Sequence, residues 1–226
     1  MFANGHKLIM DLALDAYPHP ALHGRYDAML LGNLREDVYK FPFMRRFMLG
    51  KGLTHYYKPG RRGGAFFFVP SAPTRSDFLF LRAVRLFREG KRDDAAYNLG
   101  RVAHLLSEMA APVHAQMVLH WRGDPFEMYL ETRVNELRPM KSLPPIPQGK
   151  RSAGELVHEL AVFCQAYPCD RTRNLAGYVG WRLGLIPRHD AAIVDEQVRV
   201  LVPQGAAYTV ALYRLFIEAV GESPEL

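Results

Sequence analysis

The amino-acid sequence predicts an all-α protein. Most of the chain carries apolar residues at the three- and four-residue spacing of a helix face. Ser, Asp and Pro stand at positions that typically begin or end helices. Apart from AFFFV at 65–69, no segment alternates as a strand would. The 226 residues are 49% apolar, so the chain can bury the core of one large domain or of two small ones.

The first third of the chain is expected to form two helices followed by a long loop. Residues 6–16 have the apolar spacing of a helix that ends before Pro18. Residues 24–38 have a similar pattern. Residues 39–75 are crowded with Gly, Pro, Arg and aromatic residues, which indicates irregular structure. Long loops in compact domains are usually functional.

The remainder is expected to be helical with short connections. Residues 76–89 form an amphipathic pattern with Ser76 as the expected N-cap, and residues 92–110 begin with two acids that suit the helix dipole. Asp124 is a good N-cap for a helix that begins at Pro125 and runs to about residue 138. Further helices are expected over 152–166, 171–184 and 190–221, the last broken near Pro203.

Charge and cysteine content bear on the binding partners, the cellular location and the thiol chemistry of the protein. A net charge of +6 fits an anionic partner such as a phosphodiester, a nucleic acid or an anionic lipid, although solubility alone would account for it. The first apolar segment contains Asp11 and Asp15 and lacks a signal-peptide cleavage site, so we expect a cytoplasmic protein. Cys164 and Cys169 fit neither CxxC nor a zinc knuckle, which leaves reduced thiols or a small disulfide loop open.

Residues of the kind that bind metals gather around one predicted helix. His104 and Glu108 are four residues apart and therefore share one helix face. His114 follows an Ala-Ala-Pro break that would stop the helix and turn the chain back. A carboxylate and two imidazoles at the end of an apolar helix suit a metal and would be costly in a plain core. Other acids and imidazoles stand in apolar or loop contexts, namely His6, Asp37, His55, His120, Asp124 and Glu127.

This order of residues resembles the zinc-dependent phospholipase C and single-strand-specific nuclease superfamily, an all-α fold with a three-metal site. The segment HLLSEMAAPVH at 104–114 follows the superfamily's central motif, with Glu108 in place of the usual Asp. Further positions match in order and spacing: Gly32 before Asp37, HYYKP from His55, Gly100 before His104, His120 with Asp124, and His6 near the start.

The resemblance implies a single domain over 1–226 that holds two or three Zn²⁺ ions. One zinc would be held by Asp37, His55, His104 and Glu108. A second would be held by His114, His120 and either Asp124 or Glu127, with Glu127 preferred because Asp124 has a capping role. A third would be held by His6, the amine and carbonyl of Met1, and the other oxygen of Glu108. Asp37 would also serve as general base.

The implied activity is hydrolysis of a phosphodiester. Imidazole and carboxylate suit zinc, and clustered zinc ions activate water and neutralise the charge of the transition state. Phospholipid is the first expected substrate, because the basic and aromatic loop 39–75 could meet an anionic membrane; its alternative reading is a solvated loop over buried Phe residues. Nucleic acid is the alternative substrate. Val38 replaces the aromatic residue found after the Asp in choline-selective members, which argues against choline selection.

Two other classes of function stay open. Glu108 is one methylene longer than the usual Asp, and a carboxylate that bridges two metals is sensitive to this change. A metal-binding scaffold with little or no hydrolase activity is therefore an alternative, and a non-catalytic helical interaction protein is a more distant one. No obligate protein partner is implied. The remaining histidines have no partner at ligand spacing and are expected to be structural or exposed: His19, His23, His158 and His189.

Overall fold

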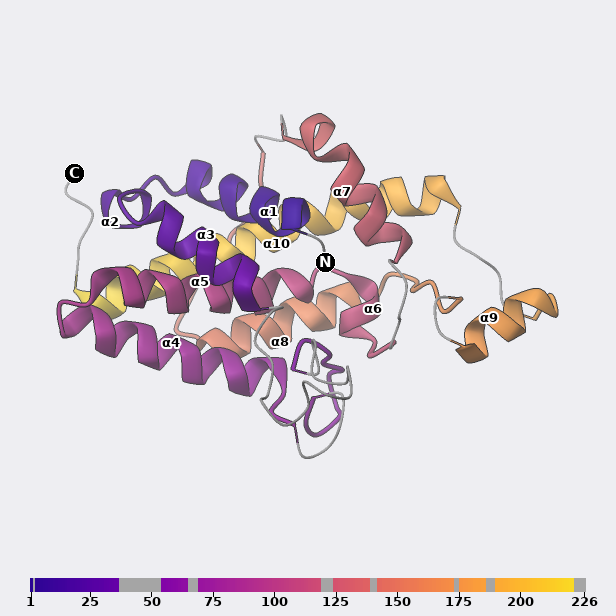
Figure 1. Cartoon of the computed structure of the whole chain (residues 1–226), viewed down its shortest axis with the longest axis horizontal. Coiled ribbons are helices and arrows are strands. Elements are labelled where there is room, and N and C mark those ends of the chain that lie inside the picture. The colour runs from indigo at the N-terminus through magenta and orange to yellow at the C-terminus, as the bar shows by residue number, and fades with distance from the viewer. Residues whose placement is uncertain are drawn as a thin grey trace.

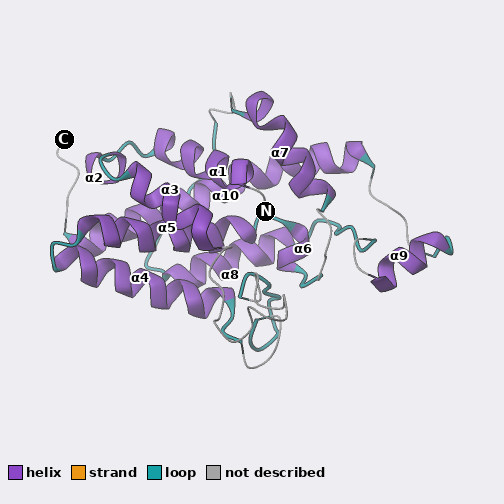
Figure 2. Cartoon of the chain, in the orientation of Figure 1, coloured by secondary structure: helices purple, strands orange, loops and turns teal. Residues whose placement is uncertain are grey.

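The computed structural model describes residues 1, 3–36, 54–64, 69–118, 124–138, 142–172, 175–185 and 190–221, and within these ranges the only regular elements are helices (Figures 1 and 2). The all-α prediction is therefore confirmed. The helices, in chain order, are α1 (Ala3–Ala16), α2 (Pro20–His23), α3 (Tyr26–Arg35), α4 (Ala72–Arg88), α5 (Arg92–Glu108), α6 (Pro112–Ala115), α7 (Pro125–Leu137), α8 (Ala153–Cys164), α9 (Leu175–Arg182) and α10 (Ala191–Val220).

Helix α5 is the centre of the packing. Every residue of α5 from Leu99 to Glu108 is buried. Helices α3 and α4 pack along α5, and α10 packs against α1, α7 and α8 (Figure 1). The C-terminal end of α5, which carries the central motif, therefore lies inside the protein rather than on its surface.

Helices α3 and α5 cross at glycine contacts. A Cβ atom at Gly32 would lie 1.9 Å from the carbonyl oxygen of Tyr97, and one at Gly100 would lie 1.9 Å from that of Met29. Each glycine thus allows the backbone of the other helix to approach more closely than any side chain would permit. Gly32 and Gly100 were singled out by the resemblance, and the structure gives both a packing role.

The start of α4 differs from the prediction. The helix begins at Ala72, and its N-cap is Ser71, whose hydroxyl accepts from the backbone N–H of Thr74 at 3.4 Å. Ser76, the expected N-cap, lies inside the helix and is fully buried. The helix extends further because Pro73 is accepted in a first helical turn, where its missing N–H is not needed. The predicted loop 39–75 is irregular over 54–64 and 69–71.

Helix α10 also differs, because it continues through Pro203 without a break. A proline inside a helix removes one hydrogen bond, but most residues on both sides of Pro203 are buried, and their packing keeps the helix intact. By length and composition α10 could cross a membrane; 78% of that apolar window is buried inside the protein, as in a central core helix.

The structure also contains two short helices that were not predicted, and it shows the state of the two cysteines. Helices α2 and α6 were not predicted, since each has only four residues and begins at a proline. The open question about Cys164 and Cys169 is answered, because both are free thiols.

Candidate metal centre

Four helices bring potential metal ligands to one buried place. Met1 precedes α1 and His6 lies in its first turns; His104 and Glu108 lie at the end of α5. The turn after Glu108 leads into α6, which carries His114, and α7 supplies Glu127. Each of these six residues is buried, and His104 and Glu108 are completely so.

Glu108 is the group around which the others are arranged. Its Oε1 lies 2.7 Å from the amino group of Met1 and 2.9 Å from Nε2 of His6. Its Oε2 lies 2.7 Å from Nε2 of His114. Nε2 of His104 lies 3.6 Å from Oε1. The two carboxylate oxygens therefore face different imidazoles, as a carboxylate shared between two metals would require.

Glu127 closes the second side of the cluster. Its Oε1 lies 2.8 Å from the amino group of Met1 and 2.9 Å from Nε2 of His114. Two overlapping groups have all their donor atoms within 4.8 Å of one another: His6, His104 and Glu108, and Glu108, His114 and Glu127. Three protein donors of nitrogen and oxygen type are a common basis for a zinc site.

The hydrogen bonds of His6 test whether a cation suits the first group. The Ser107 hydroxyl donates to the carbonyl oxygen of His104 at 2.8 Å, so at 2.6 Å it accepts from Nδ1–H of His6. Nε2 of a neutral His6 then carries a lone pair that faces the Glu108 carboxylate. Two facing lone pairs in a buried site are unfavourable without a cation to share. The donor set therefore fits a metal.

The charges of the cluster depend on each other. Burial, with the neighbouring His104, lowers the pKa of His6 to about 4, so this imidazole is neutral at pH 7. Burial acts to raise the pKa of Glu108, but His114 and the Met1 ammonium outweigh it and hold that pKa well below its ordinary value. Burial likewise opposes charge on His114, yet Glu108 raises the pKa of His114 to about 9. Without metal, Glu108 is thus an anion neutralised by Met1 and His114.

The segment 54–64 covers the cluster with aromatic residues. The ring of His55 lies 4.8 Å from that of His104, and the ring of Tyr56 lies 4.8 Å from that of His114. The backbone N–H of Tyr57 donates to the carbonyl oxygen of His114 at 3.1 Å. His55 is buried and its ring lies beside that of His104, but it belongs to neither group of three.

The structure places Asp124 and Glu127, between which the sequence left the choice of ligand open, in different surroundings. Oδ1 of Asp124 accepts from the backbone N–H of Phe126 at 2.9 Å, so this residue is the N-cap of α7. Glu127 lies in the first turn of the same helix and turns its carboxylate to His114. Asp124 is not a member of either group of three.

Asp37 and His120 lie outside the described residues. The residue before Asp37 is described: Glu36 is buried and forms an ion pair with Nε of Arg101, and Nε of Arg75 lies 3.6 Å from its second oxygen. This buried pair holds the end of α3 to α5 one turn before His104. Sequence reasoning missed Ser107 and Arg101; the signal for Arg101 was a lone arginine in the apolar stretch 99–106.

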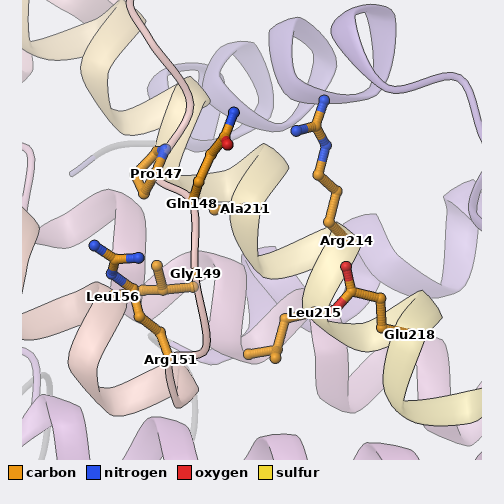
Figure 3. A pocket seen from close by; sticks show the side chains of 9 residues that line it. All are labelled: Pro147, Gln148, Gly149, Arg151, Leu156, Ala211, Arg214, Leu215 and Glu218. Atoms are coloured by element: carbon orange, nitrogen blue, oxygen red, sulfur yellow. The ribbon is translucent and has the colours of Figure 1, made fainter.

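A surface groove lies apart from the cluster. Residues 147–151, α8 and α10 line a volume of about 300 Å³, with Arg151 on one side and Arg214 and Glu218 on the other (Figure 3). None of the predicted metal ligands lines it. Arg151 also pairs with Glu159 at 2.6 Å. The groove is therefore a separate feature from the candidate metal centre.

Comparison with solved structures shows that the helices of this chain adopt a known fold. The alpha-toxin of Clostridium perfringens from avian strain SWCP superposes with a TM-score of 0.68 and 12% identity, covering 100% of this chain and 67% of that one. The alpha-toxin of Clostridium absonum gives a TM-score of 0.67 and 12% identity, over 98% of this chain and 67% of that one. The fold is that of the zinc phospholipases C.

The zinc phospholipase C fold is what the sequence motifs predicted. At 12% identity the likeness to the alpha-toxins concerns the fold. No family model matches the chain, and no curated protein matches its sequence. The evidence for chemistry therefore comes from the chain's own residues.

Proposed function

We propose that the protein is a zinc-dependent phosphoester hydrolase of the phospholipase C type. The observation that carries the proposal is the position of Glu108, fully buried and shared by two overlapping groups of ligand-type residues. A core without a ligand would not gather three imidazoles and two carboxylates around a buried amino group. The zinc phospholipase C fold supports the same reading.

Two or three zinc ions would divide these residues between them. His6, the Met1 amine and one oxygen of Glu108 would hold one ion, and His114 and Glu127 would hold another. His104, with His55 beside it, and the Glu108 carboxylate would hold a further one. We propose Asp37 and His120 as the ligands that complete these sets, and Asp37 as general base, on the strength of the motif alone.

The chain's own groups prepare the site for a charged substrate. Zinc held here would supply a hydroxide near neutral pH and positive charge for the phosphoryl oxygens. Ser107 fixes the orientation of His6, and Tyr57 fixes the backbone at His114. Burial of the cluster keeps bulk solvent from the donor atoms and strengthens each electrostatic contact. The residues would thus hold an oriented donor set at which zinc-bound water could react.

Phospholipid is the substrate we propose. The net charge of +6 suits any anionic phosphodiester, so charge alone does not separate lipid from nucleic acid. Structural likeness to two alpha-toxins within the zinc phospholipase C fold favours lipid. A single-strand nuclease activity is the alternative that a direct assay must address.

A metal-binding scaffold with weak turnover is the second candidate. The observation that favours it is the close contact of Met1 with both carboxylates, at 2.7 and 2.8 Å, which leaves an ion to compete with an ammonium for the same oxygens.

Elemental analysis with matched activity assays tests the proposal. We expect two or three zinc ions per chain and hydrolysis of phosphatidylglycerol or phosphatidylethanolamine to diacylglycerol. His104→Ala should lose zinc and at least about a thousandfold in activity, because a ligand at the centre is removed. His23→Ala, at an exposed histidine, should match the wild type.

The outcomes separate the candidate functions. Zinc without turnover of lipid or nucleic acid favours the scaffold. Hydrolysis of single-stranded DNA in place of lipid favours the nuclease alternative. Equal zinc content and activity in wild type and His104→Ala would mean that the site is assigned to the wrong residues.

A further inference from the structure

Helix α9 presents an exposed apolar surface at one end of the molecule. Figure 1 shows α9 set off from the packed helices. Its side chains Tyr178 and Val179 are 42% and 47% exposed, and Leu183 and Leu185, in the turn that follows, are 67% and 75% exposed. We call these four residues the α9 face. Exposed apolar side chains gathered in one short segment are a feature of interaction surfaces.

The exposure of the α9 face is built into the local fold. The backbone N–H of Gly184 donates to Trp181 O at 2.9 Å, and that of Leu185 donates to Gly180 O at 2.8 Å. Gly184 has a φ of 73°. This is the Schellman ending of a helix, in which the residue at the position of Leu185 usually packs on the preceding turn. Gly180 offers no side chain in that turn, and Leu185 is 75% exposed.

The sequence on both sides of the α9 face carries charge of one sign. Between Asp170 and Asp190 the sequence has four arginines and no acidic residue. Arg182 is exposed, and its guanidinium lies 6.0 Å from the ring centre of Trp181. Leucine, tryptophan and tyrosine beside arginine are the composition of surfaces that rest in the headgroup region of a bilayer.

We propose that the α9 face docks on an anionic phospholipid bilayer. The leucines at its tip enter the acyl boundary, Tyr178 and Trp181 lie at the headgroup level, and Arg182 contacts lipid phosphates. The arginine-rich, acid-free segment matches an anionic lipid surface in charge. A second copy of this chain would meet the same positive charge on both partners, which disfavours self-association through this face.

The chain just after α8 is tied to the turn after α6 and to α10. Gln116, just after α6, donates to the carbonyl oxygen of Tyr167 at 2.7 Å, and Gln197 of α10 donates to that of Pro168 at 2.7 Å. Tyr167 and Pro168 are thus held against both elements. Delivery of substrate from a docked bilayer to the metal centre rests on the proposed hydrolase function, whereas docking does not.

Vesicle binding by paired double variants tests the docking proposal. Leu183→Ser/Leu185→Ser is compared with Phe78→Ser/Leu81→Ser on α4, whose side chains are 56% and 67% exposed. We expect wild type to co-sediment with phosphatidylglycerol–phosphatidylcholine vesicles. The α9 variant should bind at least about tenfold more weakly, because it lacks the two leucines that would be buried in the bilayer. The α4 variant should bind like the wild type. Arg182→Gln should weaken binding to these anionic vesicles but not to vesicles of phosphatidylcholine alone.

A spectroscopic readout locates the contact. The chain has two tryptophans, so Trp121→Phe leaves Trp181 as the only indole. Its fluorescence should shift to shorter wavelength with anionic vesicles and be quenched by brominated acyl chains. An unchanged spectrum in vesicle-bound protein would overturn the proposal.

Other results would also overturn it. Equal vesicle binding by the α9 and α4 variants would place the contact elsewhere. A wild type that is dimeric in sedimentation velocity, with a monomeric α9 variant, would make the face an interface between copies. Hydrolysis is assayed separately on a soluble short-chain phospholipid: binding without any hydrolysis contradicts the proposed function alone, and hydrolysis without α9-dependent binding contradicts docking alone.

Discussion

Glu108 lies fully buried with an ammonium and two imidazoles against its oxygens. An isolated carboxylate in this place would be costly, so its partners are what keep it charged. The same partners set the behaviour of the metal-free protein, because His6 and His114 have pKa values displaced in opposite directions.

The metal-free protein is expected to be most stable near pH 6.5. Between pH 4 and 6.5 the unfolded chain protonates His6 and the folded chain does not, so stability rises with pH. Between pH 6.5 and 9 the folded chain keeps a proton on His114 that the unfolded chain has lost, so stability falls. One pKa unit corresponds to about 1.4 kcal/mol, so the free energy of unfolding should change by about 3 kcal/mol over each of the two pH ranges.

Urea denaturation of chelator-treated protein across this pH range measures the effect. His114→Gln should abolish the fall above pH 6.5, since this side chain does not titrate. A stability that stays constant from pH 6.5 to 9 in the wild type would contradict the ion pair between His114 and Glu108.

Asp124 and Glu127 are expected to differ sharply when substituted. Asp124→Ala removes the N-cap of α7 and should cost about 1 kcal/mol of stability while zinc content is kept. Glu127→Gln removes a charged ligand and should lower zinc content while the fold is kept. Thermal unfolding and elemental analysis of the two variants show which residue is the zinc ligand. Loss of zinc in Asp124→Ala alone would make Asp124 the ligand instead of Glu127.

At the scale of elements, the crossing of α3 and α5 fixes where the centre forms. Gly32 and Gly100 let the two backbones touch, and the Glu36–Arg101 pair joins the same helices a turn further on. Asp37 follows Glu36 directly, and His104 follows Arg101 by three residues. This contact therefore aligns the end of α3 with the ligand face of α5.

Gly100→Ala is expected to destabilise the protein by about 3 kcal/mol. The added methyl would meet backbone atoms of α3, which cannot rotate away as a side chain would. The matched control is Gly24→Ala, where φ is −65° and the nearest atom lies at 3.2 Å; its effect should stay within about 1 kcal/mol. Chemical denaturation measures both, and equal effects would mean that the helices are not in backbone contact.

The elements show where sequence patterns suffice. Long amphipathic segments such as α5 and α8 were predicted within a few residues, because apolar spacing and caps are local properties. The start of α4 was not predicted correctly, because Ser71 and Ser76 are equally good caps in isolation. The continuity of α10 was not predicted either, because burial overrides the effect of Pro203. Helix α6 is too short to leave a periodic pattern.

At the scale of the whole molecule, the candidate ligands link α1, α5, α6 and α7. A metal held by these helices binds the folded chain and not the unfolded one, and so stabilises the entire fold. Zinc at one hundred times its dissociation constant contributes about 2.7 kcal/mol.

Zinc is therefore expected to raise the Tm of chelator-treated protein by about 5–10 °C, given the chain length. Differential scanning calorimetry with and without zinc measures the shift. His104→Ala should show little of it, and His23→Ala should show all of it. A Tm that does not respond to zinc in the wild type would argue against a structural role for the metal.

The fold class, the strongly periodic helices and the set of candidate ligands could all be predicted from the sequence. These follow from apolar spacing and from the order of acids and imidazoles along the chain. Three features became visible only in the folded protein: Glu127 faces the cluster while Asp124 caps a helix, Ser107 orients His6, and the α9 face is exposed. Each of these depends on which surfaces meet across the fold, and such contacts join residues far apart in the sequence.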